Sequence, residues 1–158
     1  MWILKCSKNI KNTLEEKRME ENTSLHTECA HKPRPAVLNQ FSRTELLLGE
    51  DNMQRLFSAR VAVFGIGGVG GYTVEALARV GVGTLDLIDD DRICLTNLNR
   101  QIFATRKTIG KYKVDVAKER ILEINPKAVV NTYKTFYMPD TADQFDFSQY
   151  DYVFDAID

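Results

Sequence analysis

The sequence lacks several features that would assign it to a class of protein at once. No apolar run in its 158 residues reaches the ~18 that a membrane-spanning helix needs. The opening M-W-I-L-K-C turns polar too soon for a secretory signal. The three cysteines are odd in number and scattered, which argues against a disulfide framework and favours a reduced, cytoplasmic setting. The net charge of -1 argues against a strongly basic nucleic-acid surface, although a local patch can still exist.

The composition of the chain, with 44% apolar and 27% charged residues, is typical of one soluble globular domain. Residues 1–40 show no sustained periodicity and are predicted to form a mobile N-terminal extension. His26, Cys29 and His31 within it are spaced like metal ligands, but a fourth ligand is missing and no metal site is expected there. The ordered domain is predicted to cover residues 41–158.

Strand and helix patterns alternate through this domain. Strands are expected at residues 60–64, 84–89, 128–135 and 152–157. Helices are expected at residues 42–48, 52–57, 70–80, 111–124 and 141–147, the first opened by a capping box of Ser42 and Glu45. In the helix at 70–80, one apolar face is expected, made of Val69, Thr73, Ala76, Leu77 and Val80. The alternation predicts an α/β fold with a doubly wound parallel sheet.

A glycine-rich turn between the first strand and its helix predicts a nucleotide site. G-I-G-G-V-G, residues 65–70, matches G-x-G-x-x-G in the context that motif requires. Gly65 permits the tight turn, Gly67 lets the backbone approach a phosphate, and Gly70 lets the helix pack against the strand. Asp89 follows at the end of the second strand, where a carboxylate can accept from ribose hydroxyls. A tight turn without a ligand is the alternative.

Polar and cationic residues follow the second strand, where an NAD-dependent dehydrogenase would instead need a hydride-acceptor site. Asn97, Asn99, Arg100 and Gln101 are expected on the rim of the sheet where the ligand lies. Arg100 suits bidentate contact with phosphate oxygens. Lys113 opens a helix, where its charge opposes the helix dipole and therefore indicates a nearby anion. A solvated surface charge is the alternative interpretation for each of these two cations.

Two aspartates, Asp155 and Asp158, lie at the end of the fourth strand, on the same rim. A carboxylate opposite triphosphate oxygens is the kind of ligand that Mg²⁺ uses, so a metal role for Asp158 is predicted; a turn or N-cap aspartate is the alternative. Cys94, between the second strand and the rim, is expected to be a small buried hydrophobe.

Five motifs in order resemble the adenylate-forming superfamily that contains ThiF, MoeB and the ubiquitin-activating enzymes. They are G-I-G-G-V-G, I-D-D-D, T-N-L-N-R-Q, G-K-Y-K and D-A-I-D. Within that superfamily, F-S-R-T-E-L-L-L-G, A-R-V-G-V-G and D-A-I-D are most similar to the TcdA branch, whose members use ATP to cyclise threonylcarbamoyladenosine in tRNA. ThiF and MoeB more typically carry D-C-T-D-N at the fourth strand. The resemblance implies a Rossmann-like adenylating domain, truncated at its carboxyl end.

The resemblance also implies roles for individual residues. ATP and Mg²⁺ would be the ligands, and a homodimer the working assembly. The implied nucleotide-binding residues are Gly65, Gly67, Gly68, Gly70, Asp89, Asp91, Asn97 and Asn99. Arg100 and Lys113 would neutralise the reacting phosphates, and Asp158 would hold magnesium. Arg43 would match the arginine that relatives donate across the dimer interface.

The implied partner is a tRNA carrying threonylcarbamoyladenosine, with a cysteine desulfurase or sulfur-acceptor system as in some relatives. Two other functions stay open beside the dehydratase. One is adenylation of the C-terminus of a ubiquitin-like sulfur-carrier protein, as in ThiF and MoeB. The other is nucleotide binding without turnover, because the chain ends on a strand and lacks the downstream parts of those enzymes. An NAD-dependent dehydrogenase is the remaining alternative.

Overall fold

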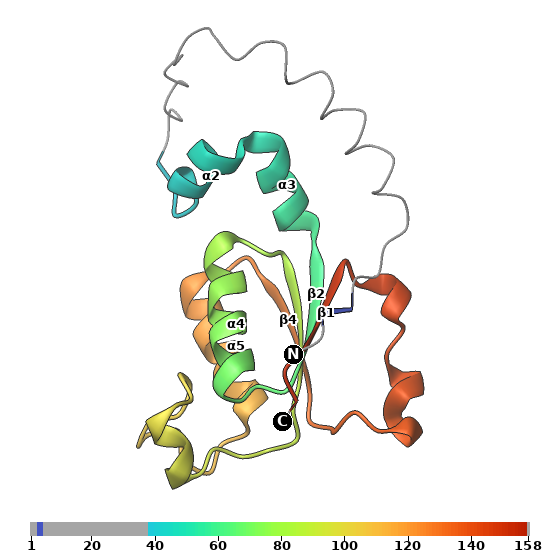
Figure 1. The fold of residues 1–158 in the computed structure, drawn as a ribbon. Helices are drawn as coiled ribbons and strands as arrows, with labels where there is room; N and C mark the ends of the chain where they lie inside the picture. Colours follow the sequence, from blue (N-terminus) through green and yellow to red (C-terminus); the bar gives the residue numbers. More distant parts are fainter. Residues whose placement is uncertain (1–2, 5–37, 158) are drawn as a thin grey trace, which may run out of the picture.

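A sheet with four parallel strands forms the centre of the molecule (Figure 1). The computed structural model describes residues 3–4 and 38–157. The parallel strands are β2 (Arg60–Phe64), β3 (Thr84–Ile88), β4 (Val129–Tyr133) and β5 (Tyr152–Asp155). The two residues of β1 (Ile3–Leu4) pair antiparallel with β5 at one edge. The four predicted strands and their parallel direction are confirmed, while the rest of the predicted extension up to residue 37, with His26, Cys29 and His31, lies outside the described residues.

The strand order β1-β5-β2-β3-β4 explains where a ligand can bind. From β2 the chain advances through α4 (Gly68–Val80), β3, α5 (Lys113–Ile124) and β4, always toward one edge. It then returns past β2 to form β5 on the other side. The direction of winding therefore reverses between β2 and β5, and such a reversal opens a crevice at the carboxyl ends of the strands.

The two faces of the sheet are covered differently, and both helices between strands lie on one face (Figure 1). On that face the alternate strand residues Val61, Val63, Leu85 and Leu87 are buried under α4 and α5. Ala62, Phe64 and Ile88 point to the other face, where Phe145 and Tyr150 cover them. The alternation of side chains along each strand thus makes two cores from short apolar runs.

The helix predicted at residues 141–147 is wrong. Two 3-10 turns, η3 (Pro139–Gln144) and η4 (Phe147–Gln149), carry the chain across the second face instead. The Thr141 hydroxyl donates to the Phe136 carbonyl (2.8 Å) and accepts from the Met138 N–H (2.9 Å), while Asp146 accepts from the Ser148 N–H (3.0 Å). Such side-chain bonds to nearby backbone offer the chain an alternative to a continuous helix.

The helical hairpin before β2 differs from prediction at its first residue. It consists of α2 (Ser42–Leu48) and α3 (Glu50–Ser58), separated by Gly49 at φ +83° as expected. The predicted capping box is wrong, because Ser42 is already helical and its hydroxyl accepts from the Asn39 N–H at 2.8 Å. The hairpin lies beyond the amino ends of the strands, away from the crevice (Figure 1).

The buried face of α4 is also not the predicted one. Gly70, Gly71, Val74 and Ala78 are buried, and of the predicted face Leu77 packs against the core, whereas Val69 is 56% exposed and Val80 37% exposed. A Cβ atom on Gly70 would lie 1.8 Å from the Gly65 carbonyl oxygen. Because only that face lets the helix approach so closely, Gly70 sets the rotation of α4, and the valines at 69 and 80 turn outward. Among the helices of the described residues, none has the length and apolarity to cross a membrane.

Candidate active site

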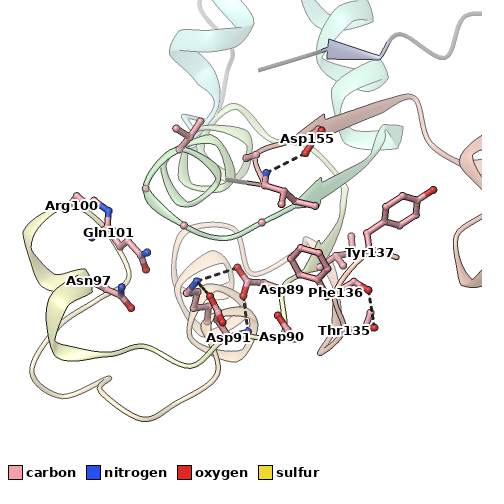
Figure 2. A pocket seen from close by; sticks show the side chains of 18 residues that line it. Asp89, Asp90, Asp91, Asn97, Arg100, Gln101, Thr135, Phe136, Tyr137 and Asp155 are labelled. Carbon is pink, nitrogen blue, oxygen red and sulfur yellow. Dashed lines mark hydrogen bonds and ion pairs between the residues drawn. The ribbon is translucent and has the colours of Figure 1, made fainter. Parts of the chain in front are cut away.

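A cavity of about 810 Å³ opens where the strand order reverses, at the carboxyl ends of the strands. Figure 2 shows Asn97, Arg100 and Gln101 on one side of it and Thr135, Phe136 and Tyr137 on the other, with the three aspartates of residues 89–91 between them. The volume lies in the range of pockets that hold a nucleotide-sized molecule.

The glycine turn forms one wall in the conformation that its sequence predicts. Gly65 adopts φ +84°, and a Cβ atom there would lie 2.6 Å from the carbonyl oxygen of Ala156, beyond the end of β5. The turn can therefore lie against the neighbouring strand only without a side chain. Gly67, Gly68 and Val69 line the cavity as α4 begins, and no side chain caps that helix end. The first N–H groups of α4 thus remain available to an anion.

Asp89 supports the glycine turn as well as lining the cavity. The residue is 8% exposed, and one of its carboxylate oxygens accepts from the Ile66 N–H at 2.7 Å. The other oxygen accepts from the Asp91 N–H at 2.8 Å. The carboxylate therefore holds the turn in place from the next strand, a function that spacing along the chain did not reveal.

Lys113 is buried at the cavity, which excludes its interpretation as a solvated surface charge. Its side chain is 8% exposed, and Nζ lies 2.6 Å from the Asp91 carboxylate and 3.5 Å from that of Asp89 (Figure 2). The ammonium also stands at the positive end of the α5 dipole, so these two carboxylates compensate a charge that would otherwise be unfavourable there.

A short antiparallel ribbon brings Lys113 to this position. Residues 91–93 pair with residues 110–113, through Gly110 N–H to Ile93 O (2.8 Å), Ile93 N–H to Lys111 O (2.9 Å) and Lys113 N–H to Asp91 O (3.0 Å). The start of α5 is thereby fixed to the segment that leaves β3. This pairing joins parts of the chain about twenty residues apart, which is why no local pattern predicts it.

The polar residues after β3 divide between the cavity and the surface. Arg100 lines the cavity, and its Cγ lies 3.7 Å from where a Gly68 Cβ would be, so its stem covers the start of α4. Asn97 is buried, with its side-chain oxygen accepting from the Cys94 N–H at 2.9 Å. Asn99 does not line the cavity, and its side-chain oxygen accepts from Arg100 at 3.1 Å. Gln101, which is 8% exposed, lines the cavity beside Gly67.

Residues after the last two strands complete the opposite wall, and the sequence did not single out most of them. Thr135, Phe136 and Tyr137 follow β4. Asp155 is the last residue of β5, where it pairs with Phe64 of β2, and Ala156 and Ile157 follow it. The available signal was their position after parallel strands, whose carboxyl ends meet at one edge. The wall adds an aromatic surface to a cavity that otherwise presents carboxylates, amides and two cations.

The sequence also predicted a role or a burial state for three further residues, which are Asp158, Arg43 and Cys94. Asp158 lies outside the described residues. Arg43 is exposed on α2 and does not line the cavity. Cys94 is exposed rather than buried, so that prediction is wrong; the ribbon turns it outward while Ile93 points into the core. A hydrogen bond with the Thr96 hydroxyl (3.0 Å) is the main cause that lowers the pKa of its thiol.

The arrangement can hold a polyphosphate anion against helix N–H groups and two cations, with an aromatic surface opposite. A carboxylate next to the glycine turn and further carboxylates on the rim add oxygen donors of the kind that bind ribose or a hard cation. These features together suit a nucleoside triphosphate.

Comparison with known proteins agrees with this geometry. The ThiF family matches residues 41–158. The tRNA threonylcarbamoyladenosine dehydratase of Bacillus subtilis (strain 168) is 48% identical over 122 residues, which are 77% of this chain and 48% of the relative. The adenylyltransferase and sulfurtransferase uba4 of Aspergillus clavatus is 35% identical over 145 residues, covering 87% of this chain and 29% of the relative.

A solved structure shares the fold. The crystal structure of E. coli TcdA, a tRNA N6-threonylcarbamoyladenosine dehydratase, in complex with ATP, superposes with a TM-score of 0.73 at 46% identity. The match covers 75% of this chain and 49% of that one. The chain spans about half the length of the curated dehydratases it matches. The resemblance indicated by the five motifs is thereby confirmed, as is the α/β architecture.

Proposed function

The chain belongs to the ThiF family, and from that membership we propose that it forms the ATP-binding part of a tRNA threonylcarbamoyladenosine dehydratase. The observation that carries the proposal is the buried ammonium of Lys113 at a cavity that begins with a glycine-rich helix end. A second cation, Arg100, lines the same cavity, as a reaction at a phosphate requires and a hydride transfer does not. The E. coli relative bound ATP in its crystal, which supports ATP as the nucleotide.

The proposed reaction proceeds in two steps. A carboxylate oxygen of the modified nucleoside attacks the α-phosphorus of ATP, the bond to the β-phosphate breaks, and pyrophosphate leaves. A nitrogen of the same nucleoside then attacks the activated acyl carbon, gives up its proton and expels AMP. The net change removes one water from the nucleoside while ATP becomes AMP and pyrophosphate, so the chemistry needs no enzyme nucleophile.

The residues of the cavity have roles that follow from their positions. Gly65, Gly67, Gly68 and the α4 N–H groups would receive phosphate oxygens, with Gly70 allowing the close approach. Asp89 and Asn97 would contact the nucleoside part. Arg100 and Lys113 would stabilise charge that develops as pyrophosphate leaves, and Asp91 holds Lys113 ready through their 2.6 Å contact. Asn99 would act through Arg100.

Mg²⁺ would be held by carboxylates on the rim. The donor set fits, because Asp90 and Asp155 offer oxygen ligands at the cavity and Mg²⁺ usually takes one or two carboxylates plus phosphate oxygens. Asp158, three residues beyond Asp155, is the ligand that the family resemblance implies. When bound, the ion would neutralise phosphate charge and orient the leaving group.

The partners proposed are a tRNA carrying threonylcarbamoyladenosine and a second copy of the chain, with Arg43 reaching the cavity of the other copy. The proposed link to a sulfur-transfer system is based on the uba4 relative, whose name includes a sulfurtransferase. That relative also favours the second candidate function, adenylation of a carrier-protein C-terminus. The two functions share the first step and differ in which carboxylate attacks.

Pyrophosphate release with defined substrates distinguishes these functions. We expect release with tRNA carrying threonylcarbamoyladenosine and not with a sulfur-carrier protein, and K113Q should lower kcat by about 10²-fold or more because it removes a charge that stabilises the transition state. K118Q is the matched control, since Lys118 is on α5 but outside the cavity lining. Thermal melts of both variants would show that the fold persists.

The opposite outcomes are equally specific. Release with the carrier protein alone would replace the dehydratase by the second function. ATP binding without release on either substrate would favour nucleotide binding without turnover. A K113Q variant as active as K118Q would remove the observation on which the proposal depends.

A further inference from the structure

Charge is segregated along this chain far more than its near-neutral total suggests. The 22 residues from Arg92 to Lys113 contain six lysines and arginines and no aspartate or glutamate. With a whole-chain charge of -1, the remaining residues carry -7. Lys113 and Arg100 belong to the cavity, which leaves Arg92, Arg106, Lys107 and Lys111. We call these four residues the outer cations.

The outer cations are exposed and largely uncompensated. Among the described residues, Arg92, Arg106 and Lys107 form no ion pair, and Lys111 reaches Glu119 at 3.8 Å, with the two side chains 53% and 67% exposed. An exposed pair at that distance contributes little. Four positive charges therefore face solvent on a molecule that is otherwise negative.

A tight turn holds Arg106 and Lys107 outward. They are the two middle residues of a turn that the Thr108 N–H closes onto the Thr105 carbonyl at 3.0 Å. The Thr108 hydroxyl fixes the same turn by donating to the Phe103 carbonyl (2.9 Å) and accepting from the Thr105 N–H (2.8 Å). The two adjacent charges are thus presented on a braced loop.

Arg92 is held in place by neutral groups. One guanidinium nitrogen donates to the Gly110 carbonyl at 2.8 Å, and the guanidinium carbon lies 3.9 Å from the centre of the Tyr112 ring. Lys134 lies against the same ring, at 4.7 Å. Tyr112 thereby fixes the arginine by a cation–π contact without neutralising it.

These charges lie beside the mouth of the cavity. Asp91, which lines the cavity, directly precedes the segment from Arg92 to Lys113, and Lys113, which also lines it, is the last residue of that segment. Within the segment, one wall of the cavity is formed by Asn97, Arg100 and Gln101. The rest of the segment forms the loops that project beyond the carboxyl ends of the strands (Figure 1). The outer cations therefore belong to the same segment as one wall of the cavity that the reacting group of a substrate would enter.

We propose that the outer cations bind the sugar–phosphate backbone of the RNA on either side of the reacting nucleoside. The inference rests on the proposed function, because it takes tRNA as the substrate. A nucleoside within RNA keeps phosphates on both sides, and these remain outside when its side chain enters the cavity. Lysines and arginines that contact such phosphates supply affinity without sequence readout.

Binding of tRNA carrying threonylcarbamoyladenosine, measured by fluorescence anisotropy over a salt titration, tests the proposal. In R106Q/K107Q the affinity at about 0.1 M salt should fall about tenfold or more, and the slope of log K against log salt should become shallower by about 1.5, because two phosphate contacts are lost. The KM for tRNA should rise while kcat at saturating tRNA and the affinity for ATP stay unchanged.

The matched control is R55Q/K127Q, which also removes two exposed cations without an ion pair among the described residues. Arg55 lies on α3 and Lys127 precedes β4, so both are at the opposite end of the sheet. We expect the control to bind tRNA with the wild-type affinity and salt slope. If tRNA affinity weakens equally in both variants, it depends only on the total charge of the protein, and the proposal is overturned.

Other results separate this inference from the proposed function. Wild-type pyrophosphate release with tRNA, combined with unchanged tRNA affinity in R106Q/K107Q, would overturn the RNA surface and leave the dehydratase intact. No release and no tRNA binding in the wild type would overturn both. Lost affinity for an acidic carrier protein, or a changed oligomeric state with tRNA affinity unchanged, would assign the outer cations to a protein interface instead.

Discussion

Gly70 determines how closely α4 approaches the turn that receives the phosphates. A side chain at this position would meet backbone, since its Cβ would lie 1.8 Å from the Gly65 carbonyl oxygen. Backbone cannot rotate away as a flexible side chain can. The third glycine of the motif therefore has a packing role, while Gly65 has a conformational one, with φ +84°.

We expect Gly70→Ala to lower the free energy of unfolding by about 3 kcal/mol or more, because the helix must move away from β2. Urea unfolding measures the change, and ATP binding should be lost with it. Gly68→Ala is the control, since a Cβ there would find its nearest neighbour, the Arg100 Cγ, at an ordinary 3.7 Å. Equal stability of the two variants would contradict the packing role.

At the scale of elements, a buried carboxylate joins the two helices that cover the sheet. Glu75 on α4 is 8% exposed and accepts hydrogen bonds from Arg79 on the same helix (2.9 Å) and from Arg120 on α5 (3.2 Å). Burial alone would raise the pKa of Glu75, but the hydrogen bonds from Arg120 and Arg79 outweigh it and hold the pKa below its ordinary value of 4.5. The charged form is thus the one that the fold favours.

Because the folded-state pKa is lowered, Glu75 stabilises the fold above its unfolded pKa, and that contribution is lost as pH falls through the folded pKa. Glu75→Gln should cost about 1 kcal/mol at pH 7, a value kept small because both arginines are about half exposed. The difference from wild type should disappear at acidic pH. Chemical unfolding at several pH values measures it, with Glu123→Gln, at an exposed partner of Arg120, expected to change stability by less than about 0.5 kcal/mol.

At the scale of the whole molecule, Arg43 and the cavity lie at opposite ends of the sheet. Arg43 is on α2, beyond the amino ends of the strands, whereas the cavity opens at their carboxyl ends (Figure 1). An arginine in that place can serve the reaction only at the cavity of another copy. The proposed dimer therefore predicts that two different inactive variants restore activity when their subunits are mixed.

We expect Arg43→Ala and Lys113→Ala each to be inactive alone and to regain about a quarter of wild-type activity when mixed and allowed to exchange subunits. Half of the dimers would then be mixed, and each would hold one complete cavity. Pyrophosphate release measures the recovery. The double variant that carries both Arg43→Ala and Lys113→Ala in every copy gives the background activity. If the mixture shows no recovery above that background, Arg43 takes no part in the reaction.

Local sequence patterns predicted the order of strands and helices, because the formation of these elements depends mainly on residues that are neighbours in sequence. The run Arg60–Phe64 matched its strand residue for residue, since a short apolar run before glycines has few alternatives. The buried face of α4 was wrong because Val69 and Val80 are apolar, yet the close approach of Gly70 decides the rotation. The helix at 141–147 failed where side chains of Thr141 and Asp146 compete for nearby backbone.

The sequence by itself determined the parallel α/β architecture, the glycine turn, the acid that follows it and a cationic segment without a single carboxylate. Each of these follows from spacing, periodicity or composition within one stretch of chain. Only the tertiary structure decided that Lys113 is buried beside Asp89 and Asp91, that Phe136 lines the same cavity, and that Glu75 joins two helices. Those contacts join segments brought together by strand order and by the ribbon between residues 91–93 and 110–113, and no local pattern encodes which segments will meet.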